Sequence, residues 1–231
     1  MAEKKDKVAI FDVDGTIFRS SLLVEIVNQL IRDGVFPEEV QRTYAKQQEK
    51  WLDREGDYQS YIEAVVKAFR ENIKGVHYGA LADAAETVVA AQWKHTYRYT
   101  RDLLAELKRK NYFLLAVSHS PKTVLDKFCP RLGFDKVYGM MYEIGPQDCF
   151  TGEVMEEFMM YNKANVIRRA VEKEQLPLAR SVAVGDTESD IPMLETVEEP
   201  ICFNPNAKLY AHAKRRQWKV VVERKDVIYE L

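Results

Sequence analysis

The sequence predicts an α/β protein with three layers, in which a mostly parallel sheet lies between helices and a block of helices follows the first strand. Three observations support this prediction. Residues 8–11 form an apolar run that stops at two acidic residues, as expected of a buried parallel strand. Residues 18–97 show helical spacing of apolar side chains throughout. From residue 98 onward, helical segments alternate with short apolar strands.

The inserted block is predicted to contain several helices separated by turn residues. The first has a helical apolar stripe and ends at Asp33-Gly34, Pro37 suits the start of the second, and Gly56-Asp57 separates the second from the third. We therefore expect a helical domain of residues 18–97 and an α/β domain formed by residues 1–17 and 98–231. The predicted helices of the block lie at 21–31, 37–51, 61–69 and 81–93.

The remaining elements follow the same alternation of helix and strand. Ser120-Pro121 suits a helix start, with serine as the cap and proline in the first turn. Gly145-Pro146 and Gly152 lie among apolar residues and indicate a β-hairpin over residues 140–156. The other predicted helices lie at 99–110, 120–132 and 162–174, and the other predicted strands at 112–117, 136–139, 181–184, 201–203 and 218–222.

Composition indicates an ordinary globular protein and excludes several classes of function. Of the 231 residues, 46% are hydrophobic and 30% are charged, and the net charge of −2 gives no electrostatic reason to bind nucleic acid or an anionic membrane. The first strand is too short for a signal peptide or a membrane span. Three cysteines without a C-x-x-C pair suggest reduced thiols. We expect a cytoplasmic protein, and the sequence leaves its oligomeric state open.

Polar side chains of matching chemistry follow three of the predicted strands. Asp12 and Asp14 follow the first strand, and Ser118 and Asp186 follow two others, while Lys163 stands near a helix start. The carboxyl ends of parallel strands share one edge of a sheet, so these groups should converge there. Two acids this close repel each other unless a cation or a shared proton offsets their charge. An ordinary Asp-Gly turn is the alternative, but the apolar strand before the acids favours a metal-assisted phosphoryl site.

The chemistry of a phosphate monoester explains why these residue types would meet. Mg²⁺ prefers oxygen ligands and commonly takes one or two carboxylates, which Asp12 and Asp186 could supply. A carboxylate can also attack phosphorus, and a second acid can move the proton of the leaving group. The Ser118 hydroxyl and the Lys163 ammonium could bind the phosphoryl oxygens as charge develops on them.

The order of these motifs makes the interpretation more specific. Asp12-Val13-Asp14-Gly15-Thr16, then Ser118, then Lys163, then the segment 185–190 resemble, in order, the four motifs of the haloacid dehalogenase superfamily. The helical insertion resembles the phosphoserine-phosphatase-like branch of that superfamily, subfamily IB. The resemblance spans essentially the whole chain and implies a three-layer, Rossmann-like core with a mostly parallel sheet and a helical cap inserted after the first strand.

The resemblance also implies a role for each acidic residue. Asp12 would be the nucleophile and a ligand of Mg²⁺. Asp14 would be the general acid and base, with its backbone carbonyl on the metal. Asp186 would complete the metal site, and Asp190 would orient Lys163 or bind a water of the metal. An interpretation of Asp190 as a helix cap would not exclude that function.

A second set of residues is expected to contact the phosphoryl group or the rest of the substrate. By the resemblance, Ser118 and Lys163 would hold the phosphoryl group, and His119 would contribute its backbone N–H. Arg19 and Ser20 lie just after the acidic motif and are candidates for substrate contacts. Scattered histidines without ligand spacing give no sign of a zinc site.

Two positions depart from the pattern of the branch. Members that hydrolyse phosphoserine usually carry Glu nine residues after the nucleophile, where this chain has Ser21, and the nearest acid is Glu25. Ser189 stands where Asn usually precedes the last acid of the fourth motif. The first departure makes phosphoserine a weaker candidate substrate. The aromatic residues of the block are expected to form its core rather than a substrate cage: Tyr58, Tyr61, Trp93, Tyr97 and Tyr99.

The leading hypothesis is a Mg²⁺-dependent phosphatase that hydrolyses a small-metabolite phosphate monoester through an aspartyl-phosphate. An amino-acid-type phosphate such as phosphoserine or histidinol phosphate would fit the branch. One alternative is a phospho-acceptor signalling module, but such modules lack a helical insertion between their first two strands. Another alternative is an inactive protein that binds metal or phosphate, although every side chain that catalysis requires is retained.

Overall fold

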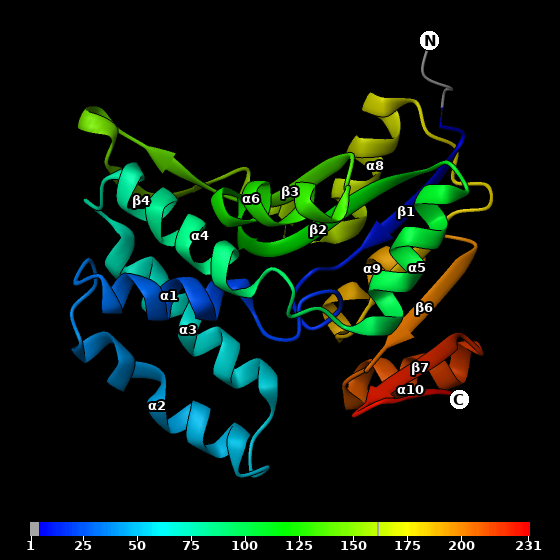
Figure 1. Cartoon of the computed structure of the whole chain (residues 1–231), viewed down its shortest axis with the longest axis horizontal. Coiled ribbons are helices and arrows are strands. Elements are labelled where there is room, and N and C mark those ends of the chain that lie inside the picture. Colours follow the sequence, from blue (N-terminus) through cyan, green and yellow to red (C-terminus); the bar gives the residue numbers. More distant parts are fainter. Residues whose placement is uncertain (1–4, 161) are drawn as a thin grey trace.

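The computed structural model describes residues 5–160 and 162–231, and within them eight strands form one sheet (Figure 1). The order across the sheet is β4-β3-β2-β1-β5-β6-β7-β8. The six inner strands run parallel, and the edge strands β4 and β8 are antiparallel to their neighbours. The strands are β1 (Lys7–Phe11), β2 (Tyr112–Pro121), β3 (Lys136–Ile144), β4 (Phe150–Met155), β5 (Val182–Gly185), β6 (Glu199–Phe203), β7 (Lys219–Arg224) and β8 (Val227–Glu230).

Strand β1 lies between β2 and β5 and is buried along most of its length. Its register is parallel on both sides, with Ala9 opposite Leu114 and Val182. One residue beyond the strand, the backbone N–H of Asp12 donates a hydrogen bond to the carbonyl of Val184 over 2.9 Å. This register brings the carboxyl ends of β1, β2 and β5 to one edge of the sheet, as the sequence predicts.

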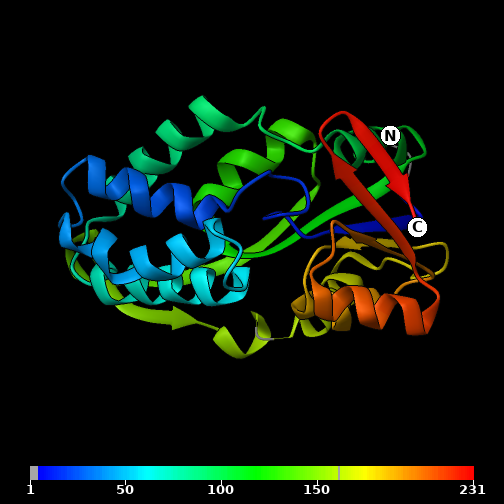
Figure 2. The ribbon, with the colours of Figure 1, turned by 90° about the horizontal axis from the view of Figure 1, so that it is seen from below.

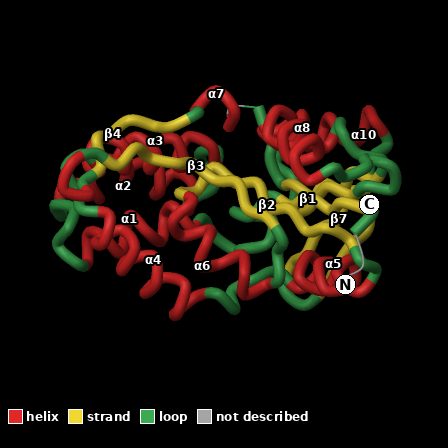
Figure 3. Tube along the Cα trace, turned by 90° about the horizontal axis from the view of Figure 1, so that it is seen from above, coloured by secondary structure: helices red, strands yellow, loops and turns green. Residues whose placement is uncertain are grey.

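Helices cover both faces of the sheet and make the three predicted layers (Figure 3). Helices α5 and α6 lie on one face, and α8 and α10 lie on the other. Among the described residues, no helix is long and apolar enough to cross a membrane. The helices outside the inserted block are α5 (Arg98–Arg109), α6 (Lys122–Leu132), α7 (Glu157–Met160), α8 (Lys163–Glu174), α9 (Ile191–Leu194) and α10 (Ala207–Arg216).

The inserted block forms a separate group of helices beside the sheet (Figure 2). Its helices pack on one another, and α4 also packs on α6, while α3 lies against β4. The block is thus held from two sides, by a helix of one face and by the antiparallel hairpin β3–β4. Its helices are α1 (Leu22–Arg32), α2 (Glu39–Leu52), α3 (Tyr58–Ile73) and α4 (Tyr78–Gln92).

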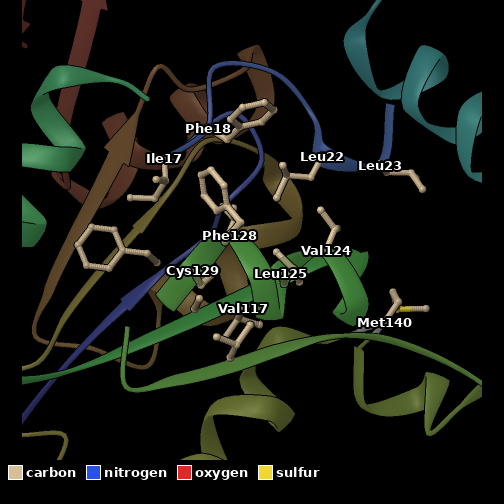
Figure 4. Packing of buried hydrophobic residues seen from close by; sticks show 14 of the residues in the cluster. Ile17, Phe18, Leu22, Leu23, Val117, Val124, Leu125, Phe128, Cys129 and Met140 are labelled. Atoms are coloured by element: carbon tan, nitrogen blue, oxygen red, sulfur yellow. The ribbon is translucent and has the colours of Figure 1, made fainter. Parts of the chain in front are cut away.

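An apolar cluster joins the loop after β1 to α6 (Figure 4). The rings of Phe18 and Phe128 meet edge to face with 5.5 Å between their centroids. Ile17 and Leu22 are buried in the same cluster. Edge-to-face aromatic pairs add to the stabilisation that burial provides. This packing fixes the path of the chain from the acidic motif into α1.

The structure corrects the predicted ends of several elements. Strand β2 continues past Ser118 to Pro121, and α6 begins at Lys122 without a side-chain cap. The Ser120 hydroxyl does not cap this helix but accepts a hydrogen bond from the backbone N–H of Leu23 over 3.1 Å. The predicted hairpin over residues 140–156 is confirmed as β3–β4. The short helix α7 and the edge strand β8 have no counterpart in the sequence prediction.

We expect Phe128→Ala to lower the free energy of unfolding by about 3–5 kcal/mol, because it removes a fully buried ring that the surrounding residues cannot replace. The control is Leu52→Ala, which truncates a side chain that is 67% exposed and should change stability by less than about 0.5 kcal/mol. Urea unfolding followed by circular dichroism measures both. A loss below about 1 kcal/mol in Phe128→Ala would contradict the role given to this cluster.

Candidate active site

Lys163 lies at the centre of the carboxyl edge of the sheet, although it is only 1% exposed. It is the first residue of α8, whose N-cap Asn162 accepts the backbone N–H of Ala164 through its side chain. The Lys163 ammonium donates to Asp12 Oδ1 over 2.5 Å and to Asp190 Oδ1 over 2.6 Å. The ammonium thus joins the strand end after β1 to the turn before α9.

Asp190 uses both of its carboxylate oxygens within the protein. Its Oδ1 accepts from Lys163, and its Oδ2 accepts the backbone N–H groups of Asp186 and Thr187 over 3.0 and 3.1 Å. With Thr187 it forms a capping box around the turn at Glu188–Asp190. Asp190 therefore closes this turn and holds Lys163, but its side chain does not cap the helix α9 that begins at Ile191, so the interpretation as a cap of that helix is wrong.

The Asp14 carboxylate is held by two other segments of the chain. Its Oδ1 accepts the backbone N–H of Leu22 over 2.5 Å, at the start of α1. Its Oδ2 accepts the Ser118 hydroxyl over 2.5 Å, and the backbone N–H of Ser120 donates to Ser118 Oγ over 2.9 Å. In this arrangement the Ser118 hydroxyl faces Asp14. The predicted contact of Ser118 with a phosphoryl group stays a prediction.

Two glycines allow the acidic segments to approach each other. Gly15 has φ +78°, which L side chains rarely adopt, and a Cβ there would lie 2.2 Å from Asp186 Oδ2. Gly185 leaves room for Asp190, because a Cβ there would lie 2.5 Å from the Asp190 Cβ. Both motif glycines are therefore required by close packing around the acids.

Burial and mutual repulsion disfavour the charged forms of the acids. Burial, followed by the charges of Asp190 and Asp14, raises the pKa of Asp12 to about 7 against the opposing effect of Lys163. Burial and the charges of Asp12 and Asp190 raise the pKa of Asp186 well above its usual value. Burial opposes the charge of Lys163, but Asp12 and Asp190 raise its pKa above the usual range. One ammonium therefore does not neutralise the cluster.

The donor set fits a hard divalent cation such as Mg²⁺. Asp12, Asp186 and Asp190 each offer a carboxylate oxygen, and these three atoms lie within 4.8 Å of one another. Thr16 donates to Asp186 Oδ1 over 3.2 Å and orients it. Oxygen-only ligands with excess negative charge suit Mg²⁺. This group of three contains side-chain oxygens alone, and the predicted contact of the metal with the backbone carbonyl of Asp14 stays a prediction.

A cavity of about 530 Å³ opens over the acids. Asp12, Asp14, Lys163 and Asp186 line its floor, and the His119 side chain lines it as well. The sequence analysis assigned only a backbone role to His119. Its Nε2 donates to the carbonyl of Met160 over 2.8 Å, and burial followed by the charge of Lys163 lowers the pKa of the ring.

Arg19 and Ser20 are not among the described residues that line the cavity. Arg19 is exposed, and the Ser20 hydroxyl donates to Glu25 Oε1 over 3.1 Å. The loop after the acidic motif turns toward α1, because Gly15 donates its N–H to the carbonyls of Phe18 and Ser20. The structure thus does not bring these two predicted substrate contacts to the site.

The sequence analysis assigned no substrate contact to the side chains that α3 presents to the cavity. Tyr58, Ile62, Val66 and Arg70 follow one another at intervals of four residues and line it together. Tyr58 lines the same cavity as the acids, and burial, followed by the charges of Asp14 and Asp186, raises its pKa. The spacing of four residues was the sequence signal that could have indicated this lining. The same spacing is equally typical of a helix face that packs in a hydrophobic core.

Comparison with known families identifies the chain. The model of the haloacid dehalogenase-like hydrolases matches residues 9–195, which contain every acid described above. This chain belongs to that family. The match agrees with the resemblance drawn from the four sequence motifs.

Three curated relatives span nearly the whole chain. A protein from Streptomyces azureus, named for inhibition of morphological differentiation, is 26% identical and covers 92% of this chain and 77% of its own length. A phosphoserine phosphatase from Methanocaldococcus jannaschii is 24% identical and covers 87% of both chains. A histidinol-phosphatase from Neisseria meningitidis serogroup C is 21% identical and covers 93% of this chain and 97% of its own.

Solved structures share the fold. A protein of unknown function from Bordetella pertussis has a TM-score of 0.72 with 18% identity, and covers 94% of this chain and 98% of its own. A phospho-aspartyl intermediate analogue of phosphoserine phosphatase has a TM-score of 0.64 with 20% identity, and covers 96% of both chains. These structures show that the fold is shared, and the curated relatives agree with the prediction of a phosphatase in the phosphoserine-phosphatase-like branch of the family.

We expect Mg²⁺ to raise the melting temperature more at pH 7.5 than at pH 5.5. The unfolded chain releases the Asp12 proton near pH 4, whereas the folded chain keeps it to about 7, so the metal-free protein loses stability as the pH rises through this window. A bound cation replaces that proton and reverses the loss. The expected rise is at least about 3 °C at pH 7.5 and half of that or less at pH 5.5, measured by scanning calorimetry.

Asp186→Asn is the control for this prediction. Removing one of the repelling carboxylates should weaken both the effect of Mg²⁺ and the loss of stability between pH 4 and 7. Equal effects of Mg²⁺ on the parent and on Asp186→Asn would show that the cation does not bind at this cluster.

Proposed function

We propose that the protein is a Mg²⁺-dependent phosphatase that hydrolyses small-molecule phosphate monoesters through a phosphorylated Asp12. The observation that carries this proposal is the position of Asp12 in the lining of the cavity. Asp12 is buried beside Lys163 and is separated from Asp14 by one residue in the sequence. A carboxylate that can act as the nucleophile, the Lys163 ammonium and a second carboxylate thus lie at one cavity. Family membership agrees with this arrangement.

The first half of the reaction transfers the phosphoryl group to the enzyme. An oxygen of Asp12 attacks phosphorus, and the bond between phosphorus and the ester oxygen breaks. Asp14 donates a proton to the departing alkoxide, which leaves as an alcohol. Lys163 offers positive charge to the phosphoryl oxygens from beside Asp12. When bound by Asp12 and Asp186, Mg²⁺ supplies further positive charge at this end of the cavity.

The second half restores the enzyme. Water attacks phosphorus, Asp14 takes a proton from that water, and the bond between phosphorus and Asp12 breaks to release inorganic phosphate. The hydrogen bonds from Leu22 and Ser118 keep the Asp14 carboxyl in one place for both proton transfers. Asp190 does not react in this scheme, and it acts by positioning Lys163.

The named activities of two relatives suggest where a substrate search should begin. Phosphoserine and histidinol phosphate are the esters that these relatives' names indicate. Both are small enough for a cavity of about 530 Å³. The net charge of −2 supplies no electrostatic attraction for nucleic acid, so a small molecule is the expected partner.

We expect Asp12→Asn to lower the rate of phosphate release from p-nitrophenyl phosphate by at least about 10³-fold, because the amide cannot act as the nucleophile. The matched control is Asp102→Asn, which alters an exposed aspartate in α5 and should leave the rate within about twofold. Phosphate release is measured with 5 mM MgCl₂. A parent-like rate in Asp12→Asn would refute the assignment of the nucleophile.

We also expect Asp14→Asn to slow both halves of the reaction, because an amide cannot exchange the proton.

Acid quenching of the parent enzyme during turnover with a ³²P-labelled ester should trap label on Asp12. Dilution into unlabelled substrate should remove that label within seconds. A label that persists for many minutes in the parent enzyme would instead favour a phospho-acceptor module.

A further inference from the structure

The cavity is apolar where it leaves the catalytic acids. On the side of the inserted block, Tyr58, Ile62 and Val66 of α3 form what we name the block wall. Their spacing of four residues places them on one face of the helix, above one another. The Tyr58 ring is held by contacts with Trp51 and Tyr61, whose ring centroids lie 5.1 and 6.3 Å from its own. The block wall is therefore a fixed surface of rings and aliphatic groups.

Apolar side chains of two other elements line the same cavity. Met140 and Tyr142 of β3 and Met160 of α7 form what we name the sheet wall. All three are buried, and Tyr142 packs edge to face on Phe69 with 5.1 Å between the ring centroids. A ligand between the two walls would contact rings, methylene groups and thioethers on both sides.

The acidic groups along these walls already have partners. Among the described lining residues outside the catalytic cluster, Glu63 accepts from Gln59 over 3.1 Å, and Glu71 pairs with Lys67 at 3.8 Å. Glu157 pairs with Arg70. Glu71 and Glu157 are therefore paired with cationic neighbours, whereas Glu63 accepts a hydrogen bond from a neutral amide; Glu63 and Glu71 are exposed.

The acid nearest to the position that usually binds an amine is also engaged. Glu25 accepts from Ser20 through Oε1 over 3.1 Å and from Gln92 through Oε2 over 2.7 Å. It is not among the described residues that line the cavity, whereas Ser21 is. An ammonium group on the substrate would lose its water in this cavity and would meet glutamates that already accept hydrogen bonds or form ion pairs within the protein, which is costly.

From these walls we infer that the substrate is a phosphate monoester whose leaving alcohol is uncharged and mainly apolar, with a chain or ring of several carbons. This inference rests on the proposed function, because it assigns the phosphoryl group to the floor at Asp12 and the leaving group to the space between the walls. An α-amino acid ester fits that space poorly, and the Arg70–Glu157 pair closes its far end with charges that balance each other.

The test is a series of straight-chain alkyl phosphates from ethyl to hexyl, compared with O-phosphoserine, at 5 mM MgCl₂. The leaving alcohols of this series have similar acidity, so the intrinsic rate of the chemical step should be similar for all of them. The substrates then differ mainly in how much apolar surface they bring to the two walls. We expect kcat/KM to rise by up to about fourfold for each added CH₂ until the cavity is filled. We expect propyl phosphate to exceed O-phosphoserine, which has the same number of carbons, by at least about tenfold. A flat series, or a preference for O-phosphoserine, overturns the inference.

Variants of the block wall locate the effect. Ile62→Asp should lower kcat/KM for hexyl phosphate at least about tenfold more than for ethyl phosphate, whereas Ile62→Leu should keep the dependence on chain length. Leu52→Asp, which places the same charge on an exposed position of the inserted block, is the matched control. Val66→Thr is a milder second variant of nearly equal volume, and it should reduce the dependence on chain length if Ile62→Asp does not fold.

The outcomes separate this inference from the proposed function. Hydrolysis that depends on Asp12 but not on chain length refutes the apolar leaving group alone. The absence of Asp12-dependent hydrolysis for every ester in the series refutes both proposals. An unchanged preference for hexyl phosphate in both Ile62→Asp and Val66→Thr shows that the leaving group does not contact the block wall, and it also overturns the inference.

Discussion

The buried ammonium of Lys163 is the constraint around which this edge of the sheet is organised. A charge without solvent is tolerated only when opposite charges and hydrogen bonds surround it, and removing one partner of such a group is strongly destabilising. Asp12 and Asp190 provide those partners at 2.5 and 2.6 Å. Their positions tie β1, α8 and the turn before α9 together. Asp186, the third acid of this group, lies against Gly15. A side chain at position 15 would overlap the Asp186 carboxylate.

The inner strands and the catalytic motifs could be predicted because their signals are local. An apolar run followed by Asp12 and Asp14 predicts a buried inner strand of a parallel sheet. The sheet order confirms this, because β1 lies between β2 and β5. Ser120 shows where local signals fail. The dipeptide Ser120-Pro121 looks like a helix start, but the strand continues because the Ser120 hydroxyl is bound by a backbone group of α1. That partner is distant in sequence, so no local pattern reveals it.

Arg19 and Ser20 illustrate a second limit. Their nearness in sequence to Asp14 suggested nearness to the substrate, but a tight turn directs them away from the cavity. The wall residues of α3 show the reverse. Tyr58 and Ile62 lie far in sequence from the acids, and their spacing is the same as that of a helix packed in a core. Which helix face meets a cavity and which meets other helices is decided by tertiary packing, and that information is absent from periodicity alone.

The parallel pairing of β1 has a consequence for the order in which the chain folds during its synthesis. Strand β1 is completed first, yet its neighbours β2 and β5 begin more than one hundred residues later along the chain. Helices α1 to α4, in contrast, contact one another across shorter separations in sequence, and such contacts form more quickly than distant ones. The ribosome therefore releases a nearly complete helical block while β1 still lacks both of its neighbours. The helical block is thus built before the sheet, and until β2 and β5 emerge the apolar strand β1 is open to non-native contacts.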